Sequence, residues 1–145
     1  MRRLFIAGLA AIVSLSVAQA AFTADLTVRI IVHPQVKGTQ IPRASLAAIF
    51  LKQAPRWSDG TPVVPVDQSV KSPVRSVFSN RVLGQALMDV QIYWQRKMSA
   101  GLLPPPVKTS DEDVITFVAS NPGAIGYVSA ATAVPDSVKT LEVAN

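Results

Sequence analysis

The segment 67–75 carries the side chains best suited to binding an anion, and it reads Asp-Gln-Ser-Val-Lys-Ser-Pro-Val-Arg. We expect a strand to end here and a helix to begin, with Ser72 as its N-cap and Pro73 as its first residue. Free backbone N–H groups and the positive end of the helix dipole attract anions at such a place, and an arginine fork matches oxyanion geometry. The candidate ligand-binding residues are Ser69, Lys71, Ser72 and Arg75.

The same residues also fit a purely structural role. Ser72 then only caps the helix, and Arg75 is a solvated residue of its first turn. Most helix starts of this composition have that explanation, so local chemistry taken alone favours the structural role.

Nothing in the sequence indicates catalysis or a cofactor. The chain has no G-x-S-x-G motif, no P-loop, no dinucleotide-binding fingerprint and no cysteine. The single histidine, His33, precedes Pro34 and has no second ligand at metal-binding spacing. We therefore expect no enzymatic activity, no cofactor and no metal site. A hydrolase built on Ser69 or Ser72 would need His33 to lie against one of them.

The N-terminus has the three parts of an export signal. Arg2 and Arg3 precede an apolar run from Leu4 to Val17, and small residues follow it at 18–20. The run is shorter than the roughly 20 apolar residues that cross a bilayer. We expect residues 1–20 to be a secretory signal peptide and residues 21–145 to form one domain. A retained membrane anchor is the alternative.

The charge of the mature chain is too small to indicate nucleic-acid binding. Removing Arg2 and Arg3 from the 14 basic residues leaves 12 against nine acidic ones, a net charge near +3. The basic residues are scattered rather than clustered on one face. The absence of cysteine also excludes disulfides, so stability must come from an apolar core.

Strand and helix patterns alternate along the chain. We expect strands over 26–32, 62–66, 124–128 and 138–143. We expect helices after Pro42, after Ser72, over 87–98 and after Ser110. The stripe Leu87, Val90, Trp94 and Met98 should face a core, and Gly126 indicates close approach of another backbone or a ligand. This alternation predicts an α/β domain with a mixed or mostly parallel sheet of about four or five strands flanked by helices.

Three segments resemble the phosphate-type substrate-binding proteins of ABC transporters. Residues 49–66 resemble the family's IFLGK…W.DG signature and the strand after it, through Ile-Phe-Leu-Lys and Arg-Trp-Ser-Asp-Gly. Residues 69–78 stand where the family has GSGTR..F. Residues 122–128, Pro-Gly-Ala-Ile-Gly-Tyr-Val, match its PGAIGYV segment almost letter for letter. Together the matches span nearly the whole mature chain.

The resemblance implies a reduced, single-domain version of the type-two periplasmic binding protein fold, which clamps an oxyanion between helix N-termini and hydroxyl donors. It implies a periplasmic location, a phosphate-like anion as ligand, and an ABC permease or another envelope protein as partner. Ser72 corresponds to the family's binding serine and Arg75 to its motif arginine.

Three positions depart from the family pattern. Pro73 and Val74 replace the Gly-Thr of the motif, and Gln68 stands where many members carry an arginine. Each change removes a donor from the oxyanion cradle. The departures favour an alternative function, an interaction or sensor-partner module of the same fold that binds no ligand.

Overall fold

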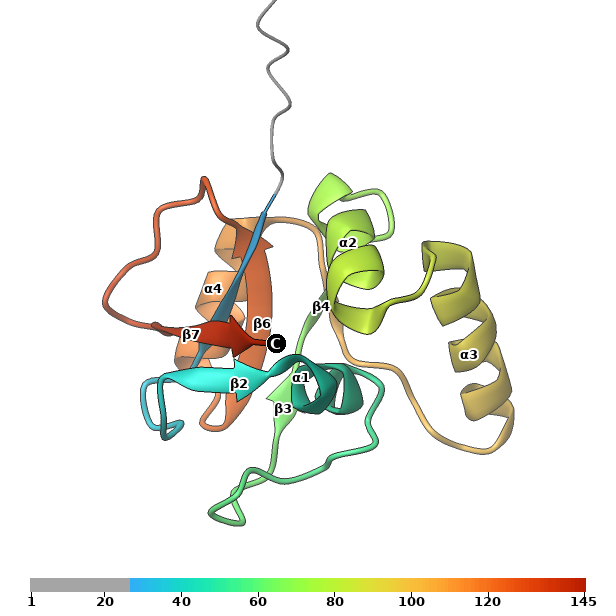
Figure 1. The fold of residues 1–145 in the computed structure, drawn as a ribbon, viewed down its shortest axis with the longest axis horizontal. Coiled ribbons are helices and arrows are strands. Elements are labelled where there is room, and N and C mark those ends of the chain that lie inside the picture. Colours follow the sequence, from blue (N-terminus) through green and yellow to red (C-terminus); the bar gives the residue numbers. More distant parts are fainter. Residues whose placement is uncertain (1–26) are drawn as a thin grey trace, which may run out of the picture.

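The computed structural model describes residues 27–145, and the predicted signal peptide, residues 1–20, lies outside the described residues. A curled five-stranded sheet forms the centre of the fold (Figure 1). In order of pairing its strands are β2 (Gln40–Pro42), β7 (Lys139–Ala144), β1 (Val28–Val32), β6 (Ala124–Ser129) and β3 (Val64–Pro65). Strand β1 pairs antiparallel with both β6 and β7, whereas β2 and β3 pair parallel with their neighbours. The predicted mixed sheet is confirmed.

Two further strands lie apart from this sheet. β4 (Asp67–Gln68) and β5 (Val107–Lys108) form a parallel pair of their own. β4 follows β3 after the single residue Val66, so the chain passes directly from the edge of the large sheet into the small one. The sequence pattern predicted one strand over 62–66 and an extended connection at β5.

The helices are α1 (Arg43–Phe50), α2 (Pro73–Phe78), α3 (Leu87–Ser99) and α4 (Asp111–Ser120), with a π-helical turn, η1 (Ser79–Leu83), continuing α2. All four α-helices fall where the sequence predicted them. Gly84 ends the α2–η1 segment in the left-handed region, at φ 65°. Among residues 27–145, no helix has the length and apolar character needed to cross a membrane.

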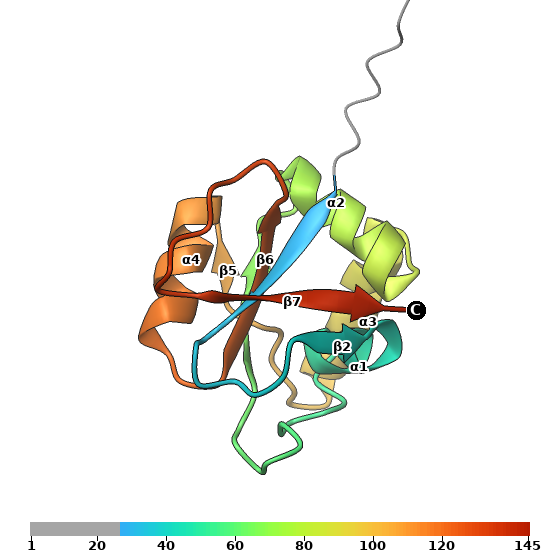
Figure 2. The ribbon, with the colours of Figure 1, turned by 60° about the vertical axis from the view of Figure 1, so that its left-hand side comes forward.

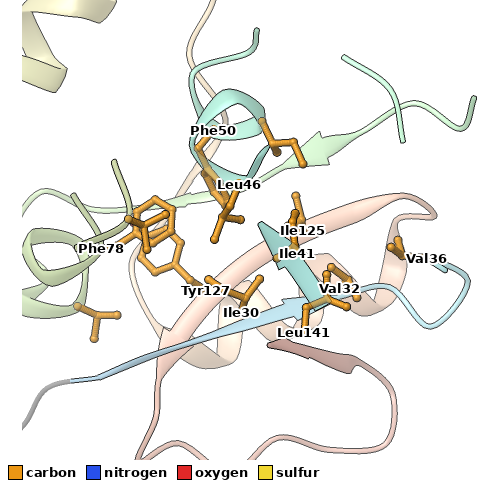
Figure 3. Packing of buried hydrophobic residues seen from close by; sticks show 13 residues of the cluster. Ile30, Val32, Val36, Ile41, Leu46, Phe50, Phe78, Ile125, Tyr127 and Leu141 are labelled. Carbon is orange, nitrogen blue, oxygen red and sulfur yellow. The ribbon is translucent and has the colours of Figure 1, made fainter. Parts of the chain in front are cut away.

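The sheet is covered on both faces, and each face has its own core (Figure 2). Ile30 and Val32 of β1 point towards α1 and α2, where Phe50, Phe78 and Tyr127 pack together (Figure 3). The residue between them, Ile31, packs with α4 on the other face. This alternation follows from the two-residue period of a strand and explains why three apolar residues, Ile30, Ile31 and Val32, follow one another in β1.

Helix α3 stands at the side of the molecule, beyond α2 (Figure 1). Val90 and Trp94 are buried as expected, but Met98 is 45% exposed. The expectation that the whole stripe faces a core is therefore wrong at Met98. All three side chains line one open cavity, and Met98, nearest the C-terminal end of α3, is the one left largely uncovered there.

Gly126 of β6 lies against side chains rather than against a backbone or a ligand. A Cβ atom at this position would lie 2.7 Å from Cγ1 of Val114 and 2.9 Å from Cγ1 of Val66. The missing side chain thus lets α4 pack closely on the sheet, which corrects the expectation from the sequence.

Candidate functional site

The loop from β4 into α2 has the predicted backbone but not the predicted hydrogen bonds. Ser72 is the N-cap of α2 and Pro73 is its first residue. The Ser72 hydroxyl makes no bond to the helix, however, and donates to Oε1 of Gln68 at 2.9 Å. Ser72, which the resemblance to phosphate-type binding proteins makes a candidate ligand-binding residue, is therefore hydrogen-bonded inside this chain.

Arg75 is buried, with 4% of its surface exposed. Its Nε lies 2.9 Å from Oδ1 of Asp67, and its Nη1 donates to the hydroxyl of Ser79. The interpretation of Arg75 as a solvated first-turn residue is wrong, because α2 packs over β4 and directs this side chain inward.

Asp67 is the centre of this buried cluster. Its Oδ1 accepts hydrogen bonds from the Tyr127 hydroxyl and from the backbone N–H of Gln68, the latter at 2.8 Å. Burial raises the pKa of the Asp67 carboxyl, while the charge of Arg75 and the Tyr127 hydroxyl oppose that rise. The pKa of Tyr127 is raised mainly by burial and, to a smaller extent, by the negative charge of Asp67. The Tyr127 hydroxyl therefore stays protonated and can donate. The cluster balances the charge of Arg75 internally.

Gln68 connects β4 to α4 and β6. Its Nε2 donates to Oδ1 of Asp111 and to the carbonyl of Tyr127, both at 2.8 Å. Oδ2 of Asp111 in turn accepts from the backbone N–H of Ser129 at 3.0 Å and from the Thr132 hydroxyl at 2.5 Å. Sequence reasoning gave Asp111 only a role at the helix dipole, and no spacing in the sequence indicates these distant partners.

An open cavity of about 540 Å³ lies beside this cluster, and we call it the β4–α3 cavity. It is lined by Asp67, Gln68, Ser69, Val70, Arg75, Val90, Gln91, Trp94, Gln95, Met98, Pro104, Pro105 and Val107. Of the four candidate ligand-binding residues, Ser69 and Arg75 line the cavity, whereas Lys71 and Ser72 do not. Its volume falls in the range of small-molecule sites, roughly 300–1,000 Å³.

Ser69 has a hydroxyl proton to offer a ligand. Its Oγ accepts from the backbone N–H of Lys71 at 3.3 Å, which occupies a lone pair and not the proton. The Lys71 side chain is exposed on the loop outside the cavity. The loop therefore presents one hydroxyl to the cavity and one positive charge near it.

His33 lies in a hydrogen bond of its own. Its Nδ1 accepts from the backbone N–H of Gln35 at 3.2 Å. Within residues 27–145, neither Ser69 nor Ser72 has a hydrogen bond to this ring, and no group of three or more His, Cys, Asp or Glu side chains could hold a metal ion.

A family model described as a PBP superfamily domain matches residues 23–143, and the chain belongs to this family. A search of curated proteins found no match. Solved structures of similar fold include a protein described as a phosphate ABC transporter substrate-binding protein, with bound phosphate, from Clostridium perfringens. It has a TM-score of 0.63 and 19% identity, and the match covers 80% of this chain and 44% of that one.

Two other solved structures give the same result. An ABC-type phosphate transport receptor from Vibrio cholerae has a TM-score of 0.63 and 21% identity over 80% of this chain and 45% of its own. PstS from Borrelia burgdorferi has a TM-score of 0.64 and 17% identity, and the match covers 81% of this chain and 47% of that one. The chain spans less than half the length of each structure. These likenesses show a shared fold, which agrees with the match to the PBP superfamily domain.

Proposed function

We propose that this chain is an exported substrate-binding protein that holds a small anion, phosphate-like or organic, in the β4–α3 cavity. It acts in the periplasm after removal of residues 1–20, without catalysis, and passes its ligand to an ABC permease or another envelope protein. Ser69 and Arg75 face the ligand, Lys71 adds positive charge nearby, and Ser72 holds Gln68 in position. Two similar solved structures support this proposal, since one is a phosphate ABC transporter substrate-binding protein with bound phosphate and the other is an ABC-type phosphate transport receptor.

One observation carries the proposal, namely that Ser69 and Arg75 line the same cavity. A hydroxyl donor and a guanidinium are the groups that bind carboxylates and phosphates elsewhere, and both are fixed here by the surrounding structure. Arg75 is held by Asp67 and Ser79, so its position is set before a ligand arrives. Preorganisation of this kind lowers the cost of binding.

A thermal-shift titration with phosphate, sulfate and organic anions at fixed ionic strength tests the proposal. A ligand at 100 times its Kd should add about 2.7 kcal/mol to the free energy of unfolding. The Ser69→Ala variant should weaken binding, whereas Ser99→Ala, an exposed serine at the end of α3, should not. Arg75 is a poor first variant because its removal leaves Asp67 buried without a counter-charge.

Export is tested separately by cell fractionation and N-terminal sequencing of the purified protein. A soluble periplasmic protein that begins near residue 21 supports the proposal. A membrane-bound protein that keeps residues 1–20 supports the retained anchor instead.

The second candidate is an interaction module that binds no small ligand. The observation that favours it is the internal use of the motif, since Ser72 bonds to Gln68 and Arg75 pairs with Asp67. The same titration separates the two candidates. If no anion stabilises the protein, the interaction module becomes the better account.

A further inference from the structure

The walls of the β4–α3 cavity are largely apolar. Trp94 and Met98 lie one helical turn apart on α3 and form part of the lining. Pro104, Pro105 and Val107, from the extended connection and β5, form another part. Figure 1 shows the chain after α3 running from the lower end of that helix back to the main body of the fold. A ligand in this cavity must therefore touch hydrocarbon over much of its surface.

Several of these apolar groups are uncovered. Met98 is 45% exposed and Val107 is 55% exposed. Val70, at the Ser69 end of the cavity, is half-exposed as well. Removing such surfaces from water is favourable in proportion to the area covered, so an apolar ligand group gains affinity here.

The polar end of the cavity is poorly suited to a compact, multiply charged oxyanion. Arg75 already faces the carboxylate of Asp67, and both residues line the cavity. A phosphate dianion beside Arg75 would lie close to that carboxylate in a partly desolvated place, where like charges repel strongly. On the α3 wall only the side-chain amides of Gln91 and Gln95 could donate, and two neutral amides replace little of the hydration shell of a dianion.

Building on the proposed function, we infer that the ligand is an amphipathic organic monoanion, a carboxylate with an aliphatic or aromatic body. The carboxylate accepts a hydrogen bond from the Ser69 hydroxyl and faces Arg75, with a single charge to set against Asp67. The body lies against Trp94, Met98 and the proline-rich connection. The Ser69 hydroxyl and the Arg75 guanidinium orient the ligand. Contact between its hydrocarbon body and the apolar walls provides most of the affinity.

The experiment measures the affinity of the purified protein for a series of carboxylates from acetate to octanoate, for phenylacetate, and for phosphate and sulfate. The Trp57→Phe variant leaves Trp94 as the single tryptophan, so its fluorescence reports on the cavity. Each added methylene should tighten binding about threefold to fourfold, and phosphate should not compete.

Met98→Ala and Met88→Ala form a matched pair. Both methionines are exposed residues of α3, at 45% and 65%, but only Met98 lines the cavity. Met98→Ala should weaken octanoate binding about tenfold or more, and Met88→Ala should leave it unchanged. Equal effects of the two substitutions would overturn the inference.

The other outcomes separate the inference from the function on which it rests. Binding of phosphate or sulfate, with no dependence on carboxylate chain length, would overturn the inference and leave the proposed function standing. Binding of octanol as tight as that of octanoate would overturn the anionic ligand, and with it both proposals. Failure of every compound to bind would also overturn both.

Discussion

Nε of Arg75 lies 2.9 Å from Oδ1 of Asp67, and both side chains are almost fully buried. Asp67 belongs to β4 and Arg75 to the first turns of α2, so the ion pair joins the small sheet to the helix that follows it. The motif arginine that the sequence offers to an anion is thus part of the packing between two elements, as well as part of a cavity wall.

Breaking this pair from the arginine side should cost about 3–5 kcal/mol in the free energy of unfolding, since it leaves a buried carboxylate without its counter-charge. We expect Arg75→Met to show this loss in urea denaturation. The double variant Asp67→Asn/Arg75→Met should recover part of it, because no charge then remains to be desolvated. Arg43→Met, at an exposed position, is the control and should stay within about 0.5 kcal/mol of the wild type. A double variant no more stable than Arg75→Met would contradict the explanation.

Most of the elements could be predicted from the sequence, because long apolar patterns and helix caps are local signals. Ser110, for example, caps α4 by accepting from the Asp113 backbone N–H at 3.1 Å, as its position before three acidic residues indicates. The predicted strand at 124–128 became β6, the strand with most buried residues. The short elements β2, β4 and β5, of two or three residues each, have too little sequence for a pattern to show.

The candidate site was harder to predict, because its contacts are set by tertiary structure. Asp67 and Tyr127 are 60 positions apart, and Gln68 and Asp111 are 43 apart. No periodicity relates such pairs, and they meet only because the fold brings β4 within hydrogen-bonding distance of side chains from β6 and α4. Sequence patterns predicted the loop before α2 and singled out Arg75 as a candidate site residue. They could not show that Arg75 pairs with Asp67.

Asp111 should stabilise the fold more than its neighbours in the same helix turn. It accepts from Gln68, from the Ser129 backbone and from Thr132, and so connects β4, α4 and the segment after β6. We expect Asp111→Ala to cost about 2–4 kcal/mol, as the loss of several charge-assisted hydrogen bonds would. Asp113→Ala is the matched control, since Asp113 is exposed in the same turn and should cost under about 1 kcal/mol. Equal losses by chemical denaturation would show that Asp111 acts only through the helix dipole.

Tyr127 should make the stability of the protein fall at alkaline pH. Its pKa is raised above the usual 10 by burial first and then by the charge of Asp67. Above about pH 10 the unfolded chain loses this proton while the folded chain keeps it, so the folded state binds more protons and its stability decreases as pH rises. The slope from this one group is at most about 1.4 kcal/mol per pH unit.

Urea denaturation at several pH values between about 8 and 11, which bracket the usual tyrosine pKa, measures this effect. Tyr127→Phe should remove the part of the slope that belongs to this group. In a Tyr93→Phe background, where Tyr127 is the only tyrosine, phenolate absorbance should appear only as the protein unfolds. Phenolate absorbance that precedes unfolding would contradict the burial of the hydroxyl.

The close approach of α4 to β6 at Gly126 predicts a substitution that is harmful alone and tolerable in combination. Gly126→Ala places a methyl group 2.7 Å from Cγ1 of Val114 and should cost about 1–3 kcal/mol through overpacking. Val114→Ala, which removes that methyl, should make the cost of Gly126→Ala smaller than it is in the wild type. A double-mutant cycle in urea measures this coupling, which should be at least about 0.5 kcal/mol and favourable. Additive losses would mean that Val66, the next atom in contact, sets the limit at this position, and Val66→Ala would then be the compensating change.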